Sequence, residues 1–154
     1  RYPTEVFNYQ RLAEWCFICQ PSAFIRRDVL MEVGGLNKNL QLCMDYDLWM
    51  RIGKKFDFMY LPYMMANSRM YDQNKTLSRK GEVHQEIIST LYKNYGYVPI
   101  CWIYGLIDFH MKGKRSLWFY IMVFWNFLYL HRKNPYFLFM YVYSNMKHQL
   151  KSFI

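Results

Sequence analysis

The C-terminal part of the chain carries no carboxylate, and this feature most restricts how that part can fold. After Asp108 the sequence contains neither Asp nor Glu, whereas Lys and Arg recur almost to its end. These cations flank two apolar runs, residues 98–107 and 117–130, and the second run contains one polar amide, Asn126. Apolar runs of this kind belong to helices that are covered, either by the rest of a protein or by lipid.

Neither run is long enough for a conventional membrane-spanning helix, which needs about 20 apolar residues. We therefore expect residues 97–154 to form a basic, aromatic helical tail that is interfacial or re-entrant, with its rings at headgroup depth. The rings concerned are those of Trp118, Trp125, Tyr129, Tyr136, Tyr141 and Tyr143. The alternative is a soluble helical subdomain whose aromatic side chains pack on the rest of the chain or on a second subunit.

Composition limits the classes of partner without choosing one. Hydrophobic residues make up 53% of the chain, which supplies a core and argues against disorder. The net charge of +9 suits a partner with phosphate groups, and both membrane lipids and nucleic acids have them. A nucleic-acid groove would interleave its cations with single aromatic rings, whereas here the cations flank long apolar runs. We therefore expect a membrane surface, and no nucleic acid, as the partner of residues 97–154.

The four cysteines, Cys16, Cys19, Cys43 and Cys101, do not form a zinc pattern. Cys16 and Cys19 have the spacing of half a zinc site, but no second pair of cysteines or histidines follows at the required distance. We expect buried or free thiols and no metal ligand among them. Reduced cysteines are typical of a cytosolic protein.

Residues 1–96 show a different pattern, in which helical and extended segments alternate. Apolar spacing predicts four helices, at residues 5–14, 28–33, 45–52 and 82–95. Short apolar runs predict four strands, at residues 15–18, 23–25, 56–61 and 64–68. Glycines follow three of the helices, at Gly34 and Gly35, at Gly53 and at Gly96. This alternation predicts an α/β layer fold for residues 1–96, followed by aromatic-rich α-helices.

Four stretches between residues 18 and 76 carry a family resemblance. They read ICQPSAFIRR, VGGLN, MDYDLWMR and SRMYDQNKT. Their order and spacing resemble the second half of the family 2 glycosyltransferases, inverting enzymes with the A-type nucleotide-diphospho-sugar transferase fold. The resemblance covers about residues 5–96. It implies an acceptor-side, C-terminal half-domain at residues 1–96, from a parent enzyme that transfers sugar from a nucleotide-sugar donor to a glycan or lipid-linked acceptor.

In that family an aspartate near the start of a short helix is the catalytic base, and Asp45 stands at the matching position. Such a carboxylate takes the proton of an acceptor hydroxyl while the oxygen attacks the anomeric carbon, so one carboxylate suffices for inversion. Met44 replaces the glutamate that often precedes this base. The other interpretation is that Asp45 only caps the helix. For Asp47 and Arg51, four residues apart, we expect a structural ion pair.

The resemblance also implies binding residues for both substrates. Gln20, Pro21, Ser22, Gly34 and Gly35 match positions that line the acceptor cleft. Arg69, Asn74, Lys75 and Thr76 match the segment that closes over the donor diphosphate, where cations stabilise the departing charge. A solvated basic loop is the alternative for Arg69 and Lys75. Tyr71 replaces a metal-binding histidine of some relatives, so the divalent cation, Mg²⁺ or Mn²⁺, is assigned to the full-length parent and not to this chain.

The donor-binding half of such an enzyme has no counterpart in the sequence. A Gly-rich phosphate loop is absent, and the only Asp-x-Asp, at Asp45 and Asp47, lies in the base region. We therefore expect the chain to be a fragment of a longer protein and to be inactive by itself. The resemblance places the parent on the cytoplasmic face of a bacterial plasma membrane, in polysaccharide or lipid-linked glycan synthesis. The alternative function is a non-catalytic membrane-surface interaction module, in which residues 97–154 act.

Overall fold

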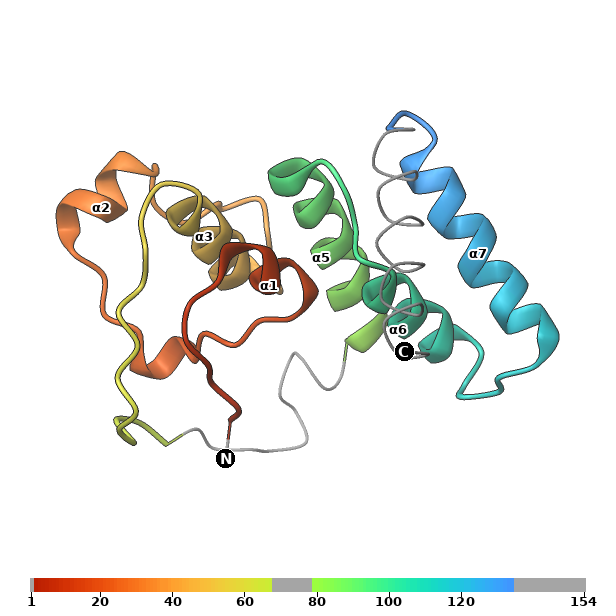
Figure 1. Ribbon diagram of the computed structural model, residues 1–154, viewed down its shortest axis with the longest axis horizontal. Helices are drawn as coiled ribbons and strands as arrows, with labels where there is room; N and C mark the ends of the chain where they lie inside the picture. The colour runs from red at the N-terminus through yellow and green to blue at the C-terminus, as the bar shows by residue number, and fades with distance from the viewer. Residues whose placement is uncertain (1, 68–78, 135–154) are drawn as a thin grey trace, which may run out of the picture.

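The computed structural model describes residues 2–67 and 79–134 (Figure 1). These residues form six α-helices and one short 3-10 helix. In chain order the elements are α1 (Tyr9–Glu14), η1 (Gln20–Ser22), α2 (Arg27–Glu32), α3 (Met44–Gly53), α5 (Lys80–Tyr95), α6 (Ile100–His110) and α7 (Leu117–His131). Figure 1 shows α2 at one end of the molecule and α7 at the other, with α5 and α6 between them.

The predicted α/β fold is wrong, because the described residues contain no β-strand. The segments expected as strands begin in extended conformation, since Trp15 has φ −165° and ψ 149° and Ala23 has φ −93° and ψ 122°. A strand also needs a neighbour that completes its ladder of backbone hydrogen bonds. Within the described part of the chain, no backbone hydrogen bond joins residues 15–18, 23–25, 56–61 or 64–67 to another extended segment. The described residues therefore form a helical structure and not the predicted partial A-type nucleotide-diphospho-sugar transferase fold.

Three of the predicted helices are confirmed, and glycines end them as expected. α2 and α3 lie within one residue of their predicted bounds, and α5 begins two residues earlier than predicted. Gly34 and Gly35 follow α2 with φ of 81° and 66°, and Gly96 follows α5 with φ of 76°. These left-handed conformations are strained for residues with a Cβ atom, so glycine lets the chain turn sharply after each helix.

The first helix is shorter than predicted, and side chains from two other helices complete its C-terminal end. α1 begins after Asn8, whose side chain caps it. At the other end, the Tyr46 hydroxyl of α3 donates to the carbonyl of Leu12, and the Trp102 indole of α6 donates to the carbonyl of Ala13 at 2.9 Å. The last carbonyls of a helix have no partner within it, so these donors satisfy groups that would otherwise be buried without one.

The core lies between α3 and α5, and it fixes the start of α3. Its buried side chains from these two helices are Tyr46, Leu48, Trp49, Met50, Ile52, Val83, Ile87 and Leu91. Burial of this apolar surface is the main stabilising contribution in such a structure. The side chains of α3 that line the larger cavity, Asp45 and Tyr46, belong to its first turn.

The three C-terminal helices pack in sequence, α5 against α6 and α6 against α7. His131, fully buried at the end of α7, joins α7 to the residues before α6: its Nε2 accepts from the Val98 N–H at 2.9 Å. Its Nδ1 donates to the Phe127 carbonyl at 2.8 Å, so the ring is neutral. Burial lowers the pKa of His131, and this outweighs the opposing effect of the hydrogen bond to Phe127. In the described part, none of the helices has both the length and the apolarity needed to cross a bilayer.

Candidate functional site

A cavity of about 990 Å³ opens at the first turn of α3 and contains Asp45 in its wall. The wall also includes Gln20, Pro21 and Ser22 of η1, three of the residues that the resemblance assigned to the acceptor cleft. The sequence separates Asp45 from this group by more than twenty residues, and the fold brings them to one cavity. A volume of this size lies within the range of small-molecule sites in proteins.

Half of the Asp45 carboxylate is free to act on a ligand. Its Oδ1 accepts from the Tyr46 N–H at 2.8 Å, which holds the group against the first turn of the helix. Its Oδ2 has no hydrogen-bond partner, and neither oxygen forms an ion pair, among residues 2–67 and 79–134. The N-cap of α3 is Cys43 and no described side chain caps the helix, so Asp45 accepts one N–H within the first turn without acting as the cap, and its second oxygen stays unpaired.

A second carboxylate, Glu86 of α5, positions the chain that leads into α3. Its two oxygens accept the N–H groups of Gln41, Leu42 and Cys43 at 2.9, 2.7 and 2.9 Å. Partial burial raises the pKa of Glu86, but the three backbone donors outweigh it and hold the pKa below its ordinary value. The sequence analysis missed this residue. The available signal was a carboxylate three residues after Val83, on the apolar side of a predicted helix.

The predicted ion pair of Asp47 and Arg51 is present and has a structural role. Arg51 Nε lies 2.8 Å from Oδ2 of Asp47, whose side chain is 2% exposed. The remaining guanidinium nitrogens of Arg51 donate to the carbonyls of Val33 and Gly35, at 2.5 and 2.6 Å. Gly34 and Gly35 thus lie at this ion pair, where they end α2, and they do not line the cavity that contains Asp45.

The donor-side residues predicted from the sequence, Arg69, Asn74, Lys75 and Thr76, lie outside the described residues. Within residues 2–67 and 79–134, no group of three or more His, Cys, Asp and Glu side chains is arranged to hold a metal ion. The cavity wall offers Asp45 and the thiols of Cys16, Cys19 and Cys43. Burial raises the pKa of the Cys16 and Cys43 thiols to about 12, and a protonated thiol is a poor metal ligand, so these two cysteines do not fit a divalent cation.

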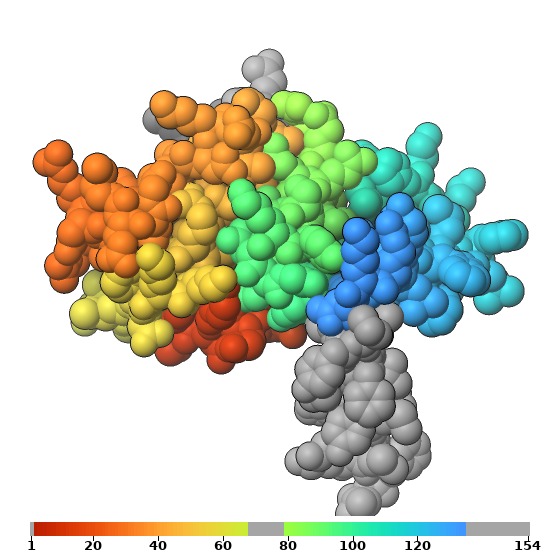
Figure 2. Space-filling model, turned by 90° about the horizontal axis from the view of Figure 1, so that it is seen from above, coloured from red at the N-terminus to blue at the C-terminus, as the bar shows by residue number. Residues whose placement is uncertain are grey.

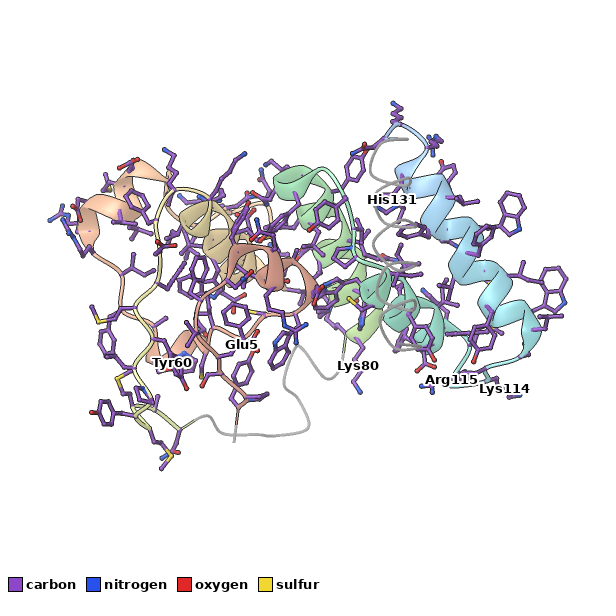
Figure 3. All side chains as sticks on the ribbon, viewed as in Figure 1. Glu5, Tyr60, Lys80, Lys114, Arg115 and His131 are labelled. Carbon is purple, nitrogen blue, oxygen red and sulfur yellow. The ribbon has the colours of Figure 1, made fainter. Side chains whose placement is uncertain are left out.

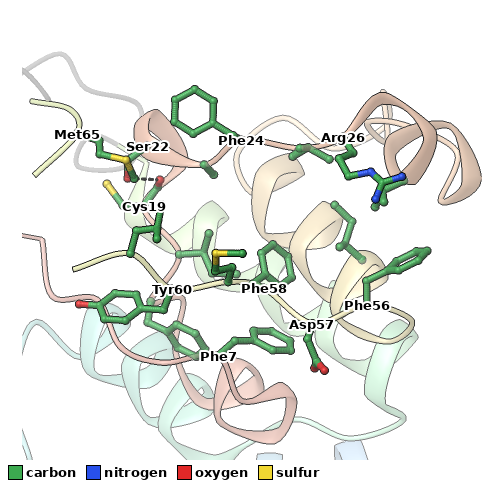
Figure 4. Close-up of a pocket in the computed structure, with 18 of the residues that line it drawn as sticks. Phe7, Cys19, Ser22, Phe24, Arg26, Phe56, Asp57, Phe58, Tyr60 and Met65 are labelled. Atoms are coloured by element: carbon green, nitrogen blue, oxygen red, sulfur yellow. Dashed lines mark hydrogen bonds between the residues drawn. The ribbon is translucent and has the colours of Figure 1, made fainter. Parts of the chain in front are cut away.

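A smaller, mainly apolar cavity of about 350 Å³ adjoins the first (Figure 4). Phe7, Phe56, Phe58 and Tyr60 line it, together with the chain that leaves η1. Both cavities share the wall formed by Ile18, Cys19, Ser22, Tyr63 and Met65. The cavity with Asp45 therefore adjoins one that is lined mainly by aromatic side chains.

Taken together, the described site contains one available carboxylate, a fixed helix start and a cavity large enough for a sugar. Burial keeps the thiols of Cys16 and Cys43 protonated, and the described part of the chain contains no cluster of three or more metal-ligating side chains. A carboxylate with an unpaired oxygen beside such a cavity has the chemistry that a general base needs. No family model, no curated protein and no solved structure matches this chain.

Proposed function

We propose that the chain carries the acceptor site of an inverting glycosyltransferase, with Asp45 as its general base. The observation that carries this proposal is the free Oδ2 of Asp45 in the wall of a cavity of about 990 Å³. Gln20, which is exposed beside that cavity, offers an amide that can hydrogen-bond to sugar hydroxyls. The resemblance supports the same assignment, because it matches Asp45 to the catalytic base and Gln20 to the acceptor cleft.

The reaction needs one proton acceptor and a fixed acceptor hydroxyl. As the hydroxyl oxygen of the acceptor forms its bond to the anomeric carbon of the donor, its proton passes to Oδ2 of Asp45. The bond from the anomeric carbon to the nucleoside diphosphate breaks at the same time, and the diphosphate leaves with the electron pair. A single displacement of this kind inverts the anomeric configuration. Much of the rate comes from holding the two reacting atoms in line, which is the contribution of the cavity wall.

The other parts of the proposal concern the partners of this site. The donor is a nucleotide sugar, and the acceptor is a glycan or a lipid-linked glycan. Arg69, Asn74, Lys75 and Thr76 are proposed to meet the diphosphate, with Mg²⁺ or Mn²⁺ held by the donor-binding part of the parent enzyme. The parent acts at the cytoplasmic face of a bacterial plasma membrane.

The test is transfer of radiolabelled sugar by the complete enzyme that contains this chain. Asp45→Asn keeps the size of the side chain and removes its basicity, so we expect transfer to fall by about 10²–10⁴-fold while nucleotide-sugar binding stays unchanged. The matched control is Asp28→Asn, which changes an exposed carboxylate on α2 and is expected to leave transfer as in the wild type. Wild-type transfer by the Asp45→Asn enzyme refutes the assignment.

A further inference from the structure

α7 is apolar on nearly all sides, but the described residues bury only one of its faces. Its buried side chains, Phe119, Val123, Phe127 and His131, follow one another at intervals of four residues. On the outer side, seven large apolar side chains are exposed: Leu117, Trp118, Tyr120, Met122, Phe124, Trp125 and Tyr129. Figure 2 shows that this end of the molecule projects side chains outward. A helix that is apolar all round is normally covered all round, so the outer face needs a partner.

Four of the exposed side chains form a continuous stripe along α7. Trp118, Met122, Trp125 and Tyr129 follow one another at spacings of four, three and four residues, and therefore form one stripe along the helix. Their exposed fractions are 69%, 40%, 63% and 63%. Trp and Tyr combine an apolar ring with a polar edge, and they are the side chains that gather at the boundary between headgroups and acyl chains.

Cations lie at both ends of this stripe. Lys112, Lys114 and Arg115 precede the helix, and Arg132 and Lys133 follow it. Figure 3 shows Lys114 and Arg115 at one end of α7 and His131 at the other. The nearest carboxylate, Asp108, is paired with Arg115 at 2.9 Å, and α7 itself contains no acidic residue. The charges around the stripe therefore favour a surface of negative phosphate groups.

The same charges argue against a second copy of the chain as the partner. Two α7 helices that paired through their stripes would place cationic ends together in the parallel and in the antiparallel orientation. The Lys and Arg side chains would then have no carboxylate to pair with on the partner helix, because α7 contains none. Like charges in contact destabilise an interface, whereas lipid phosphates would neutralise both ends.

We propose that α7 is a membrane-surface anchor that lies parallel to an anionic bilayer. The helix has 15 residues and is about 22 Å long, which is shorter than the roughly 30 Å hydrocarbon core. Its stripe of Trp118, Met122, Trp125 and Tyr129 enters the boundary of the acyl chains, and the flanking cations contact the phosphates. The guanidinium of Arg132 lies 3.9 Å from the centre of the Tyr129 ring and forms a cation–π contact with it.

The experiment is co-sedimentation of the full 154-residue chain with vesicles of phosphatidylcholine and phosphatidylglycerol in a 3:1 ratio. Trp118→Ser/Trp125→Ser removes two rings of the stripe, and we expect binding to weaken by at least about tenfold. The matched control, Val6→Ser/Met31→Ser, removes two exposed apolar side chains outside α7 and is expected to bind as the wild type does. Far-UV circular dichroism verifies that both variants are folded.

The charge dependence gives a second, independent readout. Lys112→Gln and Lys114→Gln should each weaken binding by roughly fivefold on anionic vesicles. We expect much weaker binding to pure phosphatidylcholine, and weaker binding at about 1 M salt than at about 0.1 M. Asp45→Asn should bind as the wild type does, which separates the anchor from the transfer reaction. Equal sedimentation of the Trp118→Ser/Trp125→Ser variant and the wild type overturns the proposal, as does a dimer that this variant dissociates in sedimentation equilibrium.

Discussion

Glu86 is the residue whose replacement most directly tests how the candidate site is held together. Its carboxylate accepts three backbone N–H groups from residues 41–43, just before the first turn of α3. In Glu86→Gln, a single amide oxygen can keep the two N–H groups that converge on Oε2, those of Leu42 and Cys43. The amide nitrogen must then face the N–H of Gln41, where it cannot accept.

The loss of stability in Glu86→Gln can be estimated from these three hydrogen bonds. One charge-assisted hydrogen bond is lost, and two others lose the negative charge of their acceptor. A hydrogen bond to a charged group contributes about 1.5–3 kcal/mol and a neutral one about 1 kcal/mol. Because Glu86 is only half-buried and water replaces part of the loss, we expect Glu86→Gln to lower the free energy of unfolding by about 2–3 kcal/mol.

The assay is urea unfolding followed by far-UV circular dichroism, with Glu82→Gln as the matched control. Glu82 lies one turn earlier on α5, and its exposed ion pair with Arg79 should contribute less than about 1 kcal/mol. Hydrogen exchange gives the local readout, because the amides of residues 41–43 should exchange faster in Glu86→Gln and not in Glu82→Gln. Equal stability of the two variants would show that the contacts of Glu86 do not fix the start of α3.

The lowered pKa of Glu86 makes the stability of the fold depend on pH in the acid range. The pKa of Glu86 is lower in the folded chain than in the unfolded chain. As the pH falls, the unfolded chain therefore binds the proton first, and folding stability decreases. The stabilisation from Glu86 is complete above about pH 4.5 and is lost below it. The wild type should lose more stability than Glu86→Gln over this range.

Three further predictions concern the rest of the structure. Arg51→Met leaves the buried Asp47 carboxylate without its cation and should lower the free energy of unfolding, measured in urea, by roughly 3 kcal/mol, whereas Lys54→Met at the C-cap of the same helix should change it little. Burial lowers the pKa of His131, so the wild type should become less stable as the pH falls from about 6.5 towards 5, and His131→Leu should lose this dependence. Gly96→Ala places a Cβ atom at a φ of 76° and should lower the free energy of unfolding by about 1 kcal/mol.

Local patterns in the sequence predicted the helices well, because the information needed lies within each segment. The apolar spacing of α3 and α5 and the glycines after α2 and α5 are sufficient for this purpose. The ion pair of Asp47 and Arg51 was predictable for the same reason, since residues four apart share a helix face. The grouping of Asp45 with Gln20 came from the resemblance and not from local spacing.

The fold class could not be predicted from the same patterns. An apolar run such as residues 15–18 predicts an extended backbone, but a sheet depends on a second segment that supplies the ladder. The roles of Glu86 and His131 were missed for a related reason. Each of these side chains bonds to backbone N–H groups at least 33 residues away, and local sequence patterns do not predict such a contact.

The short helix α1 has a consequence for the order in which the chain assembles. A helix of six residues cannot form stably by itself, because one or two turns do not repay the cost of nucleation. Its terminal carbonyls are occupied by Tyr46 from α3 and Trp102 from α6, so α1 can persist only after those helices have docked. Protection of the α1 amides from hydrogen exchange therefore reports the completed assembly of three helices rather than local helix formation.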